Sequence, residues 1–388
     1  MLKKIILNNY TTFINKTELN FTATNSKILD EENVTKDRIL KGAVFVGENA
    51  SGKTNILNAI NLLLKILTGT KTIDYGVYKS FYTDHPTYSV TYEFLINHDN
   101  IIYELILDTK GIVSEKVTQN KLVVLKRTKR KASFVTNGNI INRNNVPETL
   151  SFFRDIYYST QFYNNKTLNL FYEFILNSIY IDCANQHIKT TNQHTLEEIT
   201  PDNYFTNNGV EEINNFFKKI NYYQNIIYTN SSPKSKISSF SWTSPKPSIA
   251  FKKNNTDLYI PEPFESTGNR NLLYILPAFL SIIKHPGMII VNEFSSGLHN
   301  DLEEALVKYF FHYSKHSQLF FTTHSTNILN HSIVRPDQEY SIRFDYTAGG
   351  SLISRFSDQN PREAQNSEKM YLNGVFDEVP HYTKHFTD

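Results

Sequence analysis

The segment GENASGKT at positions 47–54 restricts the fold of this chain more than any other feature of the sequence. It matches the spacing G-x-x-x-x-G-K-[ST], in which glycines let backbone N–H groups turn toward a bound anion. The apolar residues 43–46 precede it, and NILNAINLLLKIL at 55–67 follows it with apolar residues at helical spacing. A strand, a glycine-rich loop and a helix in this order predict a phosphate-binding loop, because the helix adds positive potential at its N-terminus.

The loop residues have expected roles. Lys53 is expected to reach the β- and γ-phosphates of a nucleoside triphosphate, and the Thr54 hydroxyl is expected to hold Mg²⁺. The nucleotide-binding candidates in this segment are Gly47, Asn49, Ser51, Gly52, Lys53, Thr54 and Asn55. A nucleoside triphosphate and Mg²⁺ are the cofactors that these residues predict. A chance match in a glycine-containing loop is the alternative, and the flanking strand and helix argue against it.

Two apolar strands in the second half of the chain end in polar residues. MIIVNEF at 288–294 places Glu293 after a strand, where a carboxylate at the sheet edge can polarise an attacking water. LFFTTHS at 319–325 places His324 after another strand, as a candidate sensor of the γ-phosphate. Taken alone, the first segment is compatible with an ordinary strand and turn. A single histidine after a strand is more often structural than catalytic.

A fourth segment, ESTGNR at 265–270, directly precedes an expected helix. Ser266 and Gly268 at a helix start form an anion site of the same physical kind as the first loop. By itself this signal is weak, and only its position between the other segments gives it weight.

The remaining pattern divides into strands, a meander and helices. An opening hairpin is expected at 2–7 and 17–23, and an antiparallel meander at 88–127. Residues 150–230 are expected to be mainly helical, most clearly at 168–179 and 210–227, and 231–247 is expected to be a loop. The last expected elements are a helix at 269–284, a strand at 287–291, a helix at 300–314 and a strand at 318–322.

Composition excludes several classes of protein. The net charge is +2 over 388 residues, so no global field indicates a nucleic-acid or membrane partner. Cys183 is the single cysteine, which excludes an internal disulfide and suits a reducing cytosol. The longest apolar run, at 272–283, contains Pro277 and is shorter than the ~20 residues of a membrane span. With no signal-peptide pattern at the N-terminus, a cytoplasmic protein is expected.

The order GENASGKT, ESTGNR, VNEF, SSGLH, TTHS resembles that of the ABC-type ATPases, and more closely the heads of SMC and RecF-like proteins. The resemblance implies an α/β fold: a P-loop NTPase of ABC-head type, with a mixed sheet, an antiparallel β meander and a helical insertion. It also implies a homodimer, or a higher oligomer, that sandwiches ATP. Ser266 and Gly268 would then contact ATP held by the opposite subunit, and residues 297–299 would line the dimer seam.

This resemblance implies three regions. Residues 1–150 form an ATP-binding lobe with the phosphate loop and the meander, and residues 151–255 form a mainly helical insertion. Residues 256–388 carry the signature segment, the acidic strand and the switch histidine. The first and last regions together form one ATPase core.

The C-terminal part resembles stand-alone bacterial ATPases of abortive-infection and other anti-phage systems, through RPDQ at 335–338 and YLNGVFDEVPHY at 371–382. Such proteins commonly act with a separate effector, a nuclease or a toxin. The chain shows no sustained heptads and no acidic DxD pattern after His324, so neither a long coiled-coil arm nor a fused nuclease is expected.

Two positions depart from the family pattern, and both concern the metal. Asn292 stands where the family has Asp, so it keeps an oxygen acceptor but lacks the charge that orients Mg²⁺. This change predicts weaker Mg²⁺ binding and slow ATP turnover. The alternative is that Glu293 and the nucleotide phosphates are enough to hold the ion. Gln161 is the best candidate for the glutamine loop, and hence for a third metal contact beside Thr54 and Asn292. The alternative for Gln161 is a surface glutamine between aromatic residues.

A basic segment, KLVVLKRTKRK at 121–131, leaves DNA or RNA as a candidate partner, although a solvated strand end explains it equally well.

The leading hypothesis is an ATP-hydrolysing dimeric switch in phage defence, acting with a separate effector. Its rivals are a RecF-like repair ATPase that acts on DNA, and a non-hydrolysing scaffold whose dimer state is set by ATP.

Overall fold

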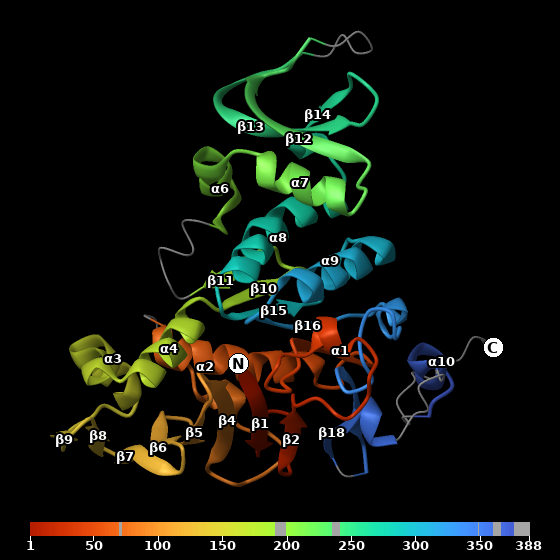
Figure 1. Ribbon diagram of the computed structural model, residues 1–388. Helices are drawn as coiled ribbons and strands as arrows, with labels where there is room; N and C mark the ends of the chain where they lie inside the picture. The colour runs from red at the N-terminus through yellow and green to blue at the C-terminus, as the bar shows by residue number, and fades with distance from the viewer. Residues whose placement is uncertain (70–71, 191–198, 235–240, 348, 360–365, 376–388) are drawn as a thin grey trace.

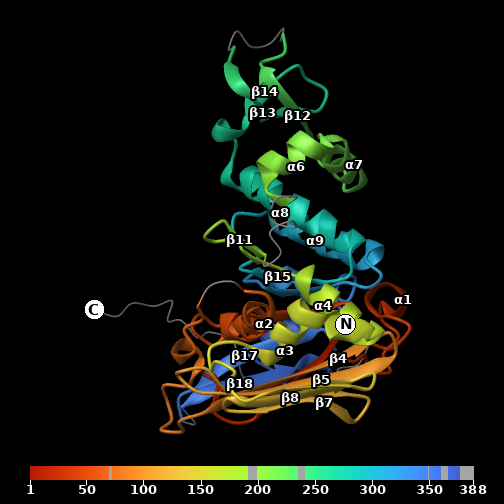
Figure 2. The same cartoon turned by 90° about the vertical axis from the view of Figure 1, so that its left-hand side faces the viewer.

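The computed structural model describes residues 1–69, 72–190, 199–234, 241–347, 349–359 and 366–375. Two large sheets lie one above the other, and a narrower arm rises from the upper sheet (Figures 1 and 2). The helix α2, Lys53–Thr68, lies between the two sheets and is buried along most of its length. No helix in these ranges is long and apolar enough to cross a bilayer.

The lower sheet is antiparallel and contains the predicted hairpin and meander. Its strand order is β2-β1-β4-β5-β6-β7-β8-β9. The bounds are β1 Leu2–Asn8, β2 Thr17–Asn20, β4 Tyr88–Ile96, β5 Asp99–Leu107, β6 Ile112–Gln119, β7 Leu122–Thr128, β8 Lys131–Thr136 and β9 Asn139–Arg143. Buried and half-buried residues alternate strictly along β4, because only one face of this sheet packs on the core. This alternation is the pattern that predicts the meander from sequence.

The upper sheet is largely parallel, in the order β11-β10-β15-β16-β3-β17-β18. Its strands are β3 Gly42–Gly47, β10 Ile179–Asp182, β11 His187–Thr190, β15 Met288–Asn292, β16 Gln318–Thr322, β17 Glu339–Asp345 and β18 Gly350–Arg355. Phe45 and Phe320 belong to the core shared with the lower sheet, whereas Val44 and Phe321 belong to the core above. Burial on both faces explains the continuous apolar runs of these strands.

The upper face of this sheet is covered by two helices, α8 Thr267–Lys284 and α9 Asn300–Tyr313 (Figure 1). Both match the helices expected near these positions. The lower core includes two further helices, α3 Phe152–Thr160 and α4 Lys166–Leu176, and the rings of Phe94 and Phe171 lie 4.9 Å apart there. The short helices are α1 Asp30–Asn33, α10 Ser367–Leu372, η1 Gly76–Tyr78, η2 Gln161–Asn164, η4 Thr326–Ile328 and η5 Phe356–Gln359.

The segment 151–255 is not mainly helical, which corrects the expected insertion. Its first helices belong to the lower core and β10 lies inside the parallel sheet; the remainder forms the arm. The arm contains α6 Pro201–Asn208, α7 Glu211–Lys219, β12 Gln224–Ser231, β13 Thr243–Lys253, β14 Tyr259–Pro261 and η3 Glu262–Phe264. The spacing of apolar residues in this segment is compatible with a helix or a strand. These residues form strands because they pair with neighbouring strands.

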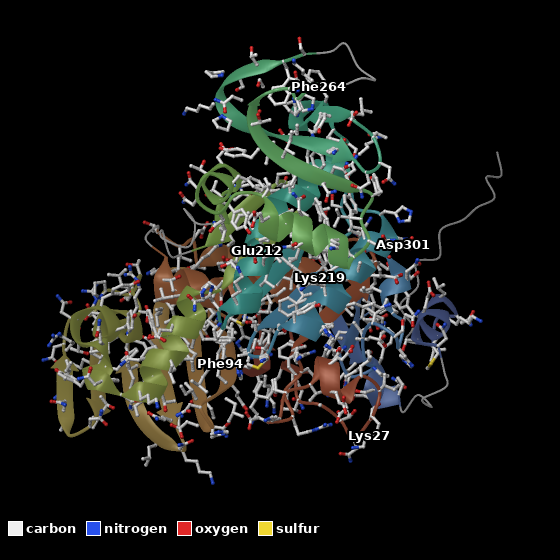
Figure 3. All side chains as sticks on the ribbon, turned by 45° about the horizontal axis from the view of Figure 1, so that its top comes forward. Lys27, Phe94, Glu212, Lys219, Phe264 and Asp301 are labelled. Carbon is white, nitrogen blue, oxygen red and sulfur yellow. The ribbon has the colours of Figure 1, made fainter. Side chains whose placement is uncertain are left out.

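The arm is anchored to the core helices through α7. Figure 3 labels Glu212 and Lys219 on this helix, and Phe264 farther out along the arm. The Lys284 ammonium at the end of α8 lies 2.6 Å from the Glu212 carboxylate. The Lys219 ammonium lies over the Tyr313 ring of α9, 4.2 Å from its centroid. The arm therefore rests on the two helices that follow the signature segment and the acidic strand.

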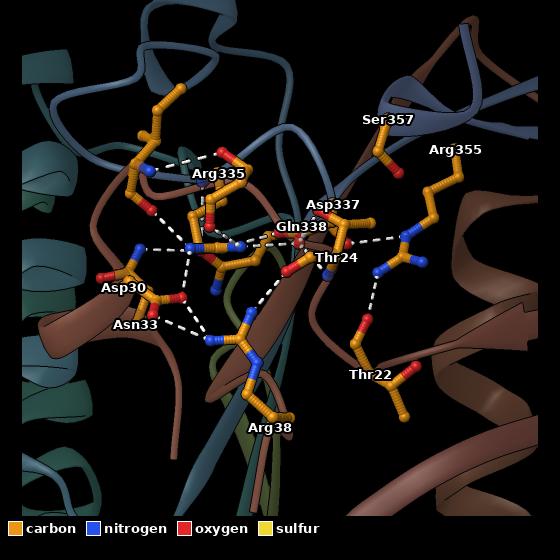
Figure 4. Close-up of polar contacts among 12 residues, drawn as sticks. Thr22, Thr24, Asp30, Asn33, Arg38, Arg335, Asp337, Gln338, Arg355 and Ser357 are labelled. Atoms are coloured by element: carbon orange, nitrogen blue, oxygen red, sulfur yellow. Dashed lines mark hydrogen bonds and ion pairs between the residues drawn. The ribbon is translucent and has the colours of Figure 1, made fainter. Parts of the chain in front are cut away.

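RPDQ at 335–338 has a structural role in this fold (Figure 4). The fully buried Arg335 guanidinium donates to the Asp337 carboxylate at 2.8 Å and to Asp30 at 3.1 Å. Asp337 also accepts from the Thr24 backbone N–H and hydroxyl, both at 2.7 Å. Gln338 accepts from Asn33 at 2.7 Å. This polar network fastens the N-terminal segment to the start of β17.

Candidate nucleotide site

The phosphate-loop segment joins the end of β3 to the start of α2, as predicted. A cavity of about 180 Å³ opens there. It is lined by Asn49, Ala50, Ser51, Gly52, Lys53, Thr54, Asn55, Glu293, Thr322 and His324. The structure thus brings the loop, the end of β15 and the end of β16 to one place. This follows from the parallel pairing of β3 with β16 and of β16 with β15, which puts their carboxyl ends at one edge.

The loop backbone is suited to an anion. Gly52 adopts φ 109°, and a Cβ there would lie 2.7 Å from both the Ser351 and the Thr12 hydroxyls. Gly52 also caps α2 without a side-chain acceptor, and the first turn contains no acidic residue. The first N–H groups of α2 are therefore available to a phosphate and face no competing carboxylate within the turn. These features fit the triphosphate that the motif predicts.

Lys53 lies inside this loop with its charge only partly compensated. Its ammonium donates to the Gly47 carbonyl at 2.8 Å and to the Glu48 carbonyl at 2.5 Å. Burial lowers its pKa to about 8, while the nearby carboxylates of Glu293 and Glu48 act in the opposite direction. A triphosphate beside this ammonium would favour its charged form.

Asn292 lies buried behind two lining residues of the cavity, Thr54 and Thr322. The Asn292 side-chain oxygen accepts from the Thr54 hydroxyl at 3.1 Å and from the Thr322 hydroxyl at 3.2 Å. Hydroxyl and amide oxygens suit Mg²⁺, so Thr54 and Asn292 fit the ion as neutral ligands. The described ranges contain no group of three or more His, Cys, Asp or Glu residues placed to hold a metal. The negative charge for Mg²⁺ would therefore come mainly from the phosphates, with Glu293 nearby.

Glu293 and His324 face the cavity from the ends of adjacent strands. Glu293 adopts φ 55°, a left-handed conformation that is unusual for a residue with a side chain, and its N–H donates to the Thr322 hydroxyl at 2.8 Å. Such strain often marks functional positions. Burial, and then the Lys53 charge, lower the pKa of His324, while Glu293 acts in the opposite direction, so the neutral imidazole is favoured. A neutral ring can both donate and accept a hydrogen bond.

The signature residues lie outside this cavity. Ser266 caps α8, and its hydroxyl accepts from the Asn269 N–H at 3.2 Å. A Cβ on Gly268 would lie 2.4 Å from the Gly297 carbonyl oxygen, so the start of α8 packs closely on the turn that follows β15. Asn271 strengthens this contact by donating to the Ser296 carbonyl at 3.0 Å. That Ser266 and Gly268 reach a nucleotide on a second copy stays a prediction.

The structure does not bring Gln161 to the site. Gln161 is exposed and ends α3, next to Phe162, which packs against Tyr172. The Tyr172 hydroxyl bonds to the Leu67 carbonyl, near the C-terminal end of α2. Since 16 residues of helix span roughly 24 Å, Gln161 lies near the wrong end of α2 for a contact with Thr54.

A different glutamine follows the strand beside β15. Asp182 ends β10 in register with Asn292, and Gln186 comes shortly after it. The Gln186 amide donates to Asn271 at 2.5 Å, so its loop contacts the start of α8. Neither residue was among the sequence-predicted candidates, because β10 fell within the segment assigned as helical. The four-residue strand IYID was the available signal.

The basic segment 121–131 is less uniform than its sequence indicates. Arg127 is fully buried; its guanidinium donates to the Pro147 carbonyl at 2.7 Å and lies 3.6 Å from the Glu115 carboxylate. Lys121, Lys126, Lys129, Arg130 and Lys131 are exposed. A basic surface therefore exists on the meander, but Arg127 stabilises the fold and does not contribute to that surface.

Comparison with known proteins agrees with this geometry. Residues 43–330 match the family described as "AAA domain, putative AbiEii toxin, Type IV TA system". No curated protein matches the chain. Among solved structures, an SMC head bound to the C-winged helix domain of ScpA matches with a TM-score of 0.51 and 15% identity, over 92% of this chain and 99% of that one.

Two further SMC heads match less closely. The head domain from Thermotoga maritima has a TM-score of 0.46 and 14% identity, over 91% of this chain and 98% of that chain. A head with an extended coiled coil, bound to the C-terminal domain of ScpA from Pyrococcus furiosus, has a TM-score of 0.48 and 13% identity, over 97% and 99%. The fold is that of an SMC-head-like ATPase, and the chain belongs to the AAA-domain family of AbiEii type.

Proposed function

We propose that this protein is an ATP-hydrolysing switch that dimerises around ATP and controls a separate effector in bacterial defence. The observation that supports it most directly is the convergence of Lys53, Glu293 and His324 on one cavity beside the Thr54–Asn292 contact. These are the groups that hold a triphosphate, orient a water and sense the terminal phosphate. Their meeting depends on strands that are far apart in the sequence, so chance is a poor explanation.

In this proposal each residue has a distinct role. Lys53 and the first N–H groups of α2 neutralise the phosphates, and Thr54 with Asn292 holds Mg²⁺, which would stabilise charge on the phosphate oxygens. Glu293 accepts a proton from the attacking water, because its carboxylate faces the cavity from a fixed backbone. His324 contacts the terminal phosphate and transmits its loss to the following loop.

Dimerisation is proposed because the signature residues do not line their own chain's cavity. Ser266 and Gly268 would complete the site of a second copy, and their close packing on Gly297 would couple that contact to the end of β15. The defence role rests on the description of the family, which names a toxin of a type IV toxin–antitoxin system. The effector, a nuclease or a toxin, is proposed to be a separate protein.

One observation favours a second function, an ATP-gated scaffold that does not hydrolyse. Asn292 provides a neutral oxygen to the Mg²⁺ position. With less charge on the metal ligands, ATP could be held without being cleaved, and the dimer would persist.

One experiment separates these functions: phosphate release and mass in solution, measured together for the wild type, Lys53→Ala and Glu293→Gln. A switch predicts turnover in the wild type, none in either variant, and an ATP-bound dimer that accumulates for Glu293→Gln. A scaffold predicts ATP-dependent dimerisation without phosphate release in the wild type. Failure of the wild type to bind ATP would reject both.

A further inference from the structure

A second and larger cavity lies at the opposite edge of the parallel sheet from the nucleotide site. Its volume is about 730 Å³. Lys41 directly precedes β3, Pro286 precedes β15, and Lys315 with His316 precedes β16. These residues therefore lie at the amino ends of the same strands whose carboxyl ends hold the nucleotide site. A five-residue strand spans roughly 16 Å, so the two cavities are separate. We call this second cavity the amino-edge cavity.

The floor of the amino-edge cavity is apolar. Val34, Ile39, Ile96 and Phe174 line it and are each at most 7% exposed. Leu95, Leu170 and Pro286 extend this surface toward the rim. A buried glutamine holds the strands beneath in place: Gln318 accepts from the Leu2 N–H at 2.6 Å and donates to the Leu40 carbonyl at 3.0 Å. A preformed apolar cavity of this size is typical of small-molecule sites.

Lys41 contributes a buried ammonium to the wall of this cavity. Lys41 is 7% exposed, and its ammonium makes a single hydrogen bond within the described chain, to the Phe311 carbonyl at 2.8 Å. An ammonium carries three N–H donors, so two remain for another acceptor. No carboxylate of the described residues lies within ion-pair distance of it. Burial lowers the pKa of Lys41, with Glu32 acting weakly in the opposite direction.

The rim carries the same sign of charge. Lys36 and Lys315 are exposed there, together with His98 and His316. The one acidic lining residue, Asp37, lies 3.4 Å from the His98 imidazole. The cavity therefore combines an apolar floor, a buried cation with spare donors and a basic entrance.

We propose that the amino-edge cavity binds a small amphipathic anion, with an apolar body on the floor and a carboxylate or phosphate head on Lys41. A charged head would give the Lys41 ammonium the acceptors that the chain does not supply, and the body would remove apolar surface from water. A polar polyanion would leave the floor uncovered, and an amphipathic cation would place its charge against three lysines.

Titration calorimetry on the full chain tests this proposal, with octanoate and octyl phosphate as probes of the two head groups. Sulfate is the probe of negative charge without an apolar body, and octylamine is the probe of the apolar body with the wrong charge. Saturable binding of octanoate or octyl phosphate, at least tenfold tighter than octylamine or sulfate, is the expected result. Whichever of the two binds more tightly identifies the head group. Equal binding of octylamine, or no saturable binding of either anion, would overturn the proposal.

Two variants test the location. Lys41→Met keeps the apolar stem and removes the charge, and should weaken anion binding at least tenfold, whereas Lys129→Met on the meander should not. Leu170→Trp adds bulk from a half-exposed position of the lining, and should weaken binding by a similar factor. Its control is Leu122→Trp, a position that is 73% exposed on β7. Unchanged affinity in Lys41→Met and Leu170→Trp, with both folded by circular dichroism, would place the anion elsewhere and reject the site.

Discussion

The side-chain oxygen of Asn292 lies 3.1 Å from the hydroxyl of Thr54, although 238 positions separate them in the sequence. The contact joins the end of β15 to the first turn of α2, across the intervening strand β16. Two neutral groups thus meet where Thr54 lines the nucleotide site. The chemistry of the site depends on whether these neutral oxygens suffice for Mg²⁺.

Asn292→Asp should increase ATP turnover and lower the Mg²⁺ concentration needed for half-maximal rate. The new carboxylate would sit between the hydroxyls of Thr54 and Thr322 and would attract the divalent ion through charge as well as through an oxygen ligand. We expect an increase of about tenfold in rate at limiting Mg²⁺, corresponding to about 1.4 kcal/mol. Phosphate release measured across a Mg²⁺ titration checks it.

The control for this substitution is Asn300→Asp, which adds the same charge at an exposed position at the start of α9. It should leave the Mg²⁺ dependence unchanged. If Asn292→Asp behaves like this control, the neutral residue does not limit turnover, and Glu293 with the phosphates suffices.

ATP affinity should fall as the pH rises above about 8. The pKa of Lys53 is lowered to about 8 by burial, so in the free protein its ammonium loses a proton in this range, far below the usual value for lysine. Charged Lys53 binds phosphate and neutral Lys53 does not, hence the dissociation constant should rise by up to about tenfold per pH unit above that value. A fluorescent ATP analogue titrated between pH 7 and 10 checks it. A constant affinity to pH 10 would show that Lys53 stays charged.

The parts of this site that could be predicted from sequence are those marked by a local pattern of neighbouring residues. The loop at 47–54, Glu293 and His324 were found because each directly follows a strand that is continuously apolar and buried on both faces. Their convergence then followed from the rule that parallel strands end at one sheet edge. Arg127 could not be separated from its basic neighbours, because its burial depends on the Pro147 and Leu150 carbonyls, which a later segment supplies.

The arm and the glutamine loop show the limit of local patterns. β10 has only four residues, and its place beside β15 is decided by pairing with a strand more than 100 positions away. The aromatic and apolar residues of segment 150–230 have spacings that are compatible with a helix or a strand equally well. The strand before Gln186 was therefore not expected, and Gln161 in YYSTQFY, which the structure keeps away from Thr54, was the candidate that local sequence offered.

The Arg335–Asp337 network should make stability sensitive to acid. Burial alone would raise the pKa of Asp337, but hydrogen bonds and charge from Arg335, with further hydrogen bonds from Thr24, lower it below the ordinary value. A carboxyl whose pKa is lower in the folded state adds stability above about pH 4, and this contribution is lost as the pH falls through the folded-state value. The free energy of unfolding in urea should therefore decrease from pH 7 down to pH 3. The Asp337→Asn variant should show a smaller decrease over the same pH range.

Arg335→Met offers a second test of the same network. It leaves a buried carboxylate without its cation, which costs about 3–5 kcal/mol in comparable pairs. Arg343→Met is the control, since Arg343 is partly exposed and lies 3.5 Å from Asp345 near the surface. Equal losses for both variants would mean that the network adds no more than a surface ion pair.

Gly268→Ala should weaken ATP-dependent dimerisation, because the start of α8 has no room for a side chain. The new Cβ would lie 2.4 Å from the Gly297 carbonyl oxygen, so either α8 or the turn after β15 must shift. We expect a loss of about 1–3 kcal/mol in urea unfolding, typical of overpacking, and a larger relative loss of dimer in light scattering with ATP. Gly76→Ala is the matched control, since its Cβ would meet the flexible Asp74 side chain at 3.2 Å and make ordinary contact with Thr109 at 3.9 Å. If Gly268→Ala dimerises like this control, the packing of Gly268 on Gly297 does not shape the surface that meets a second copy.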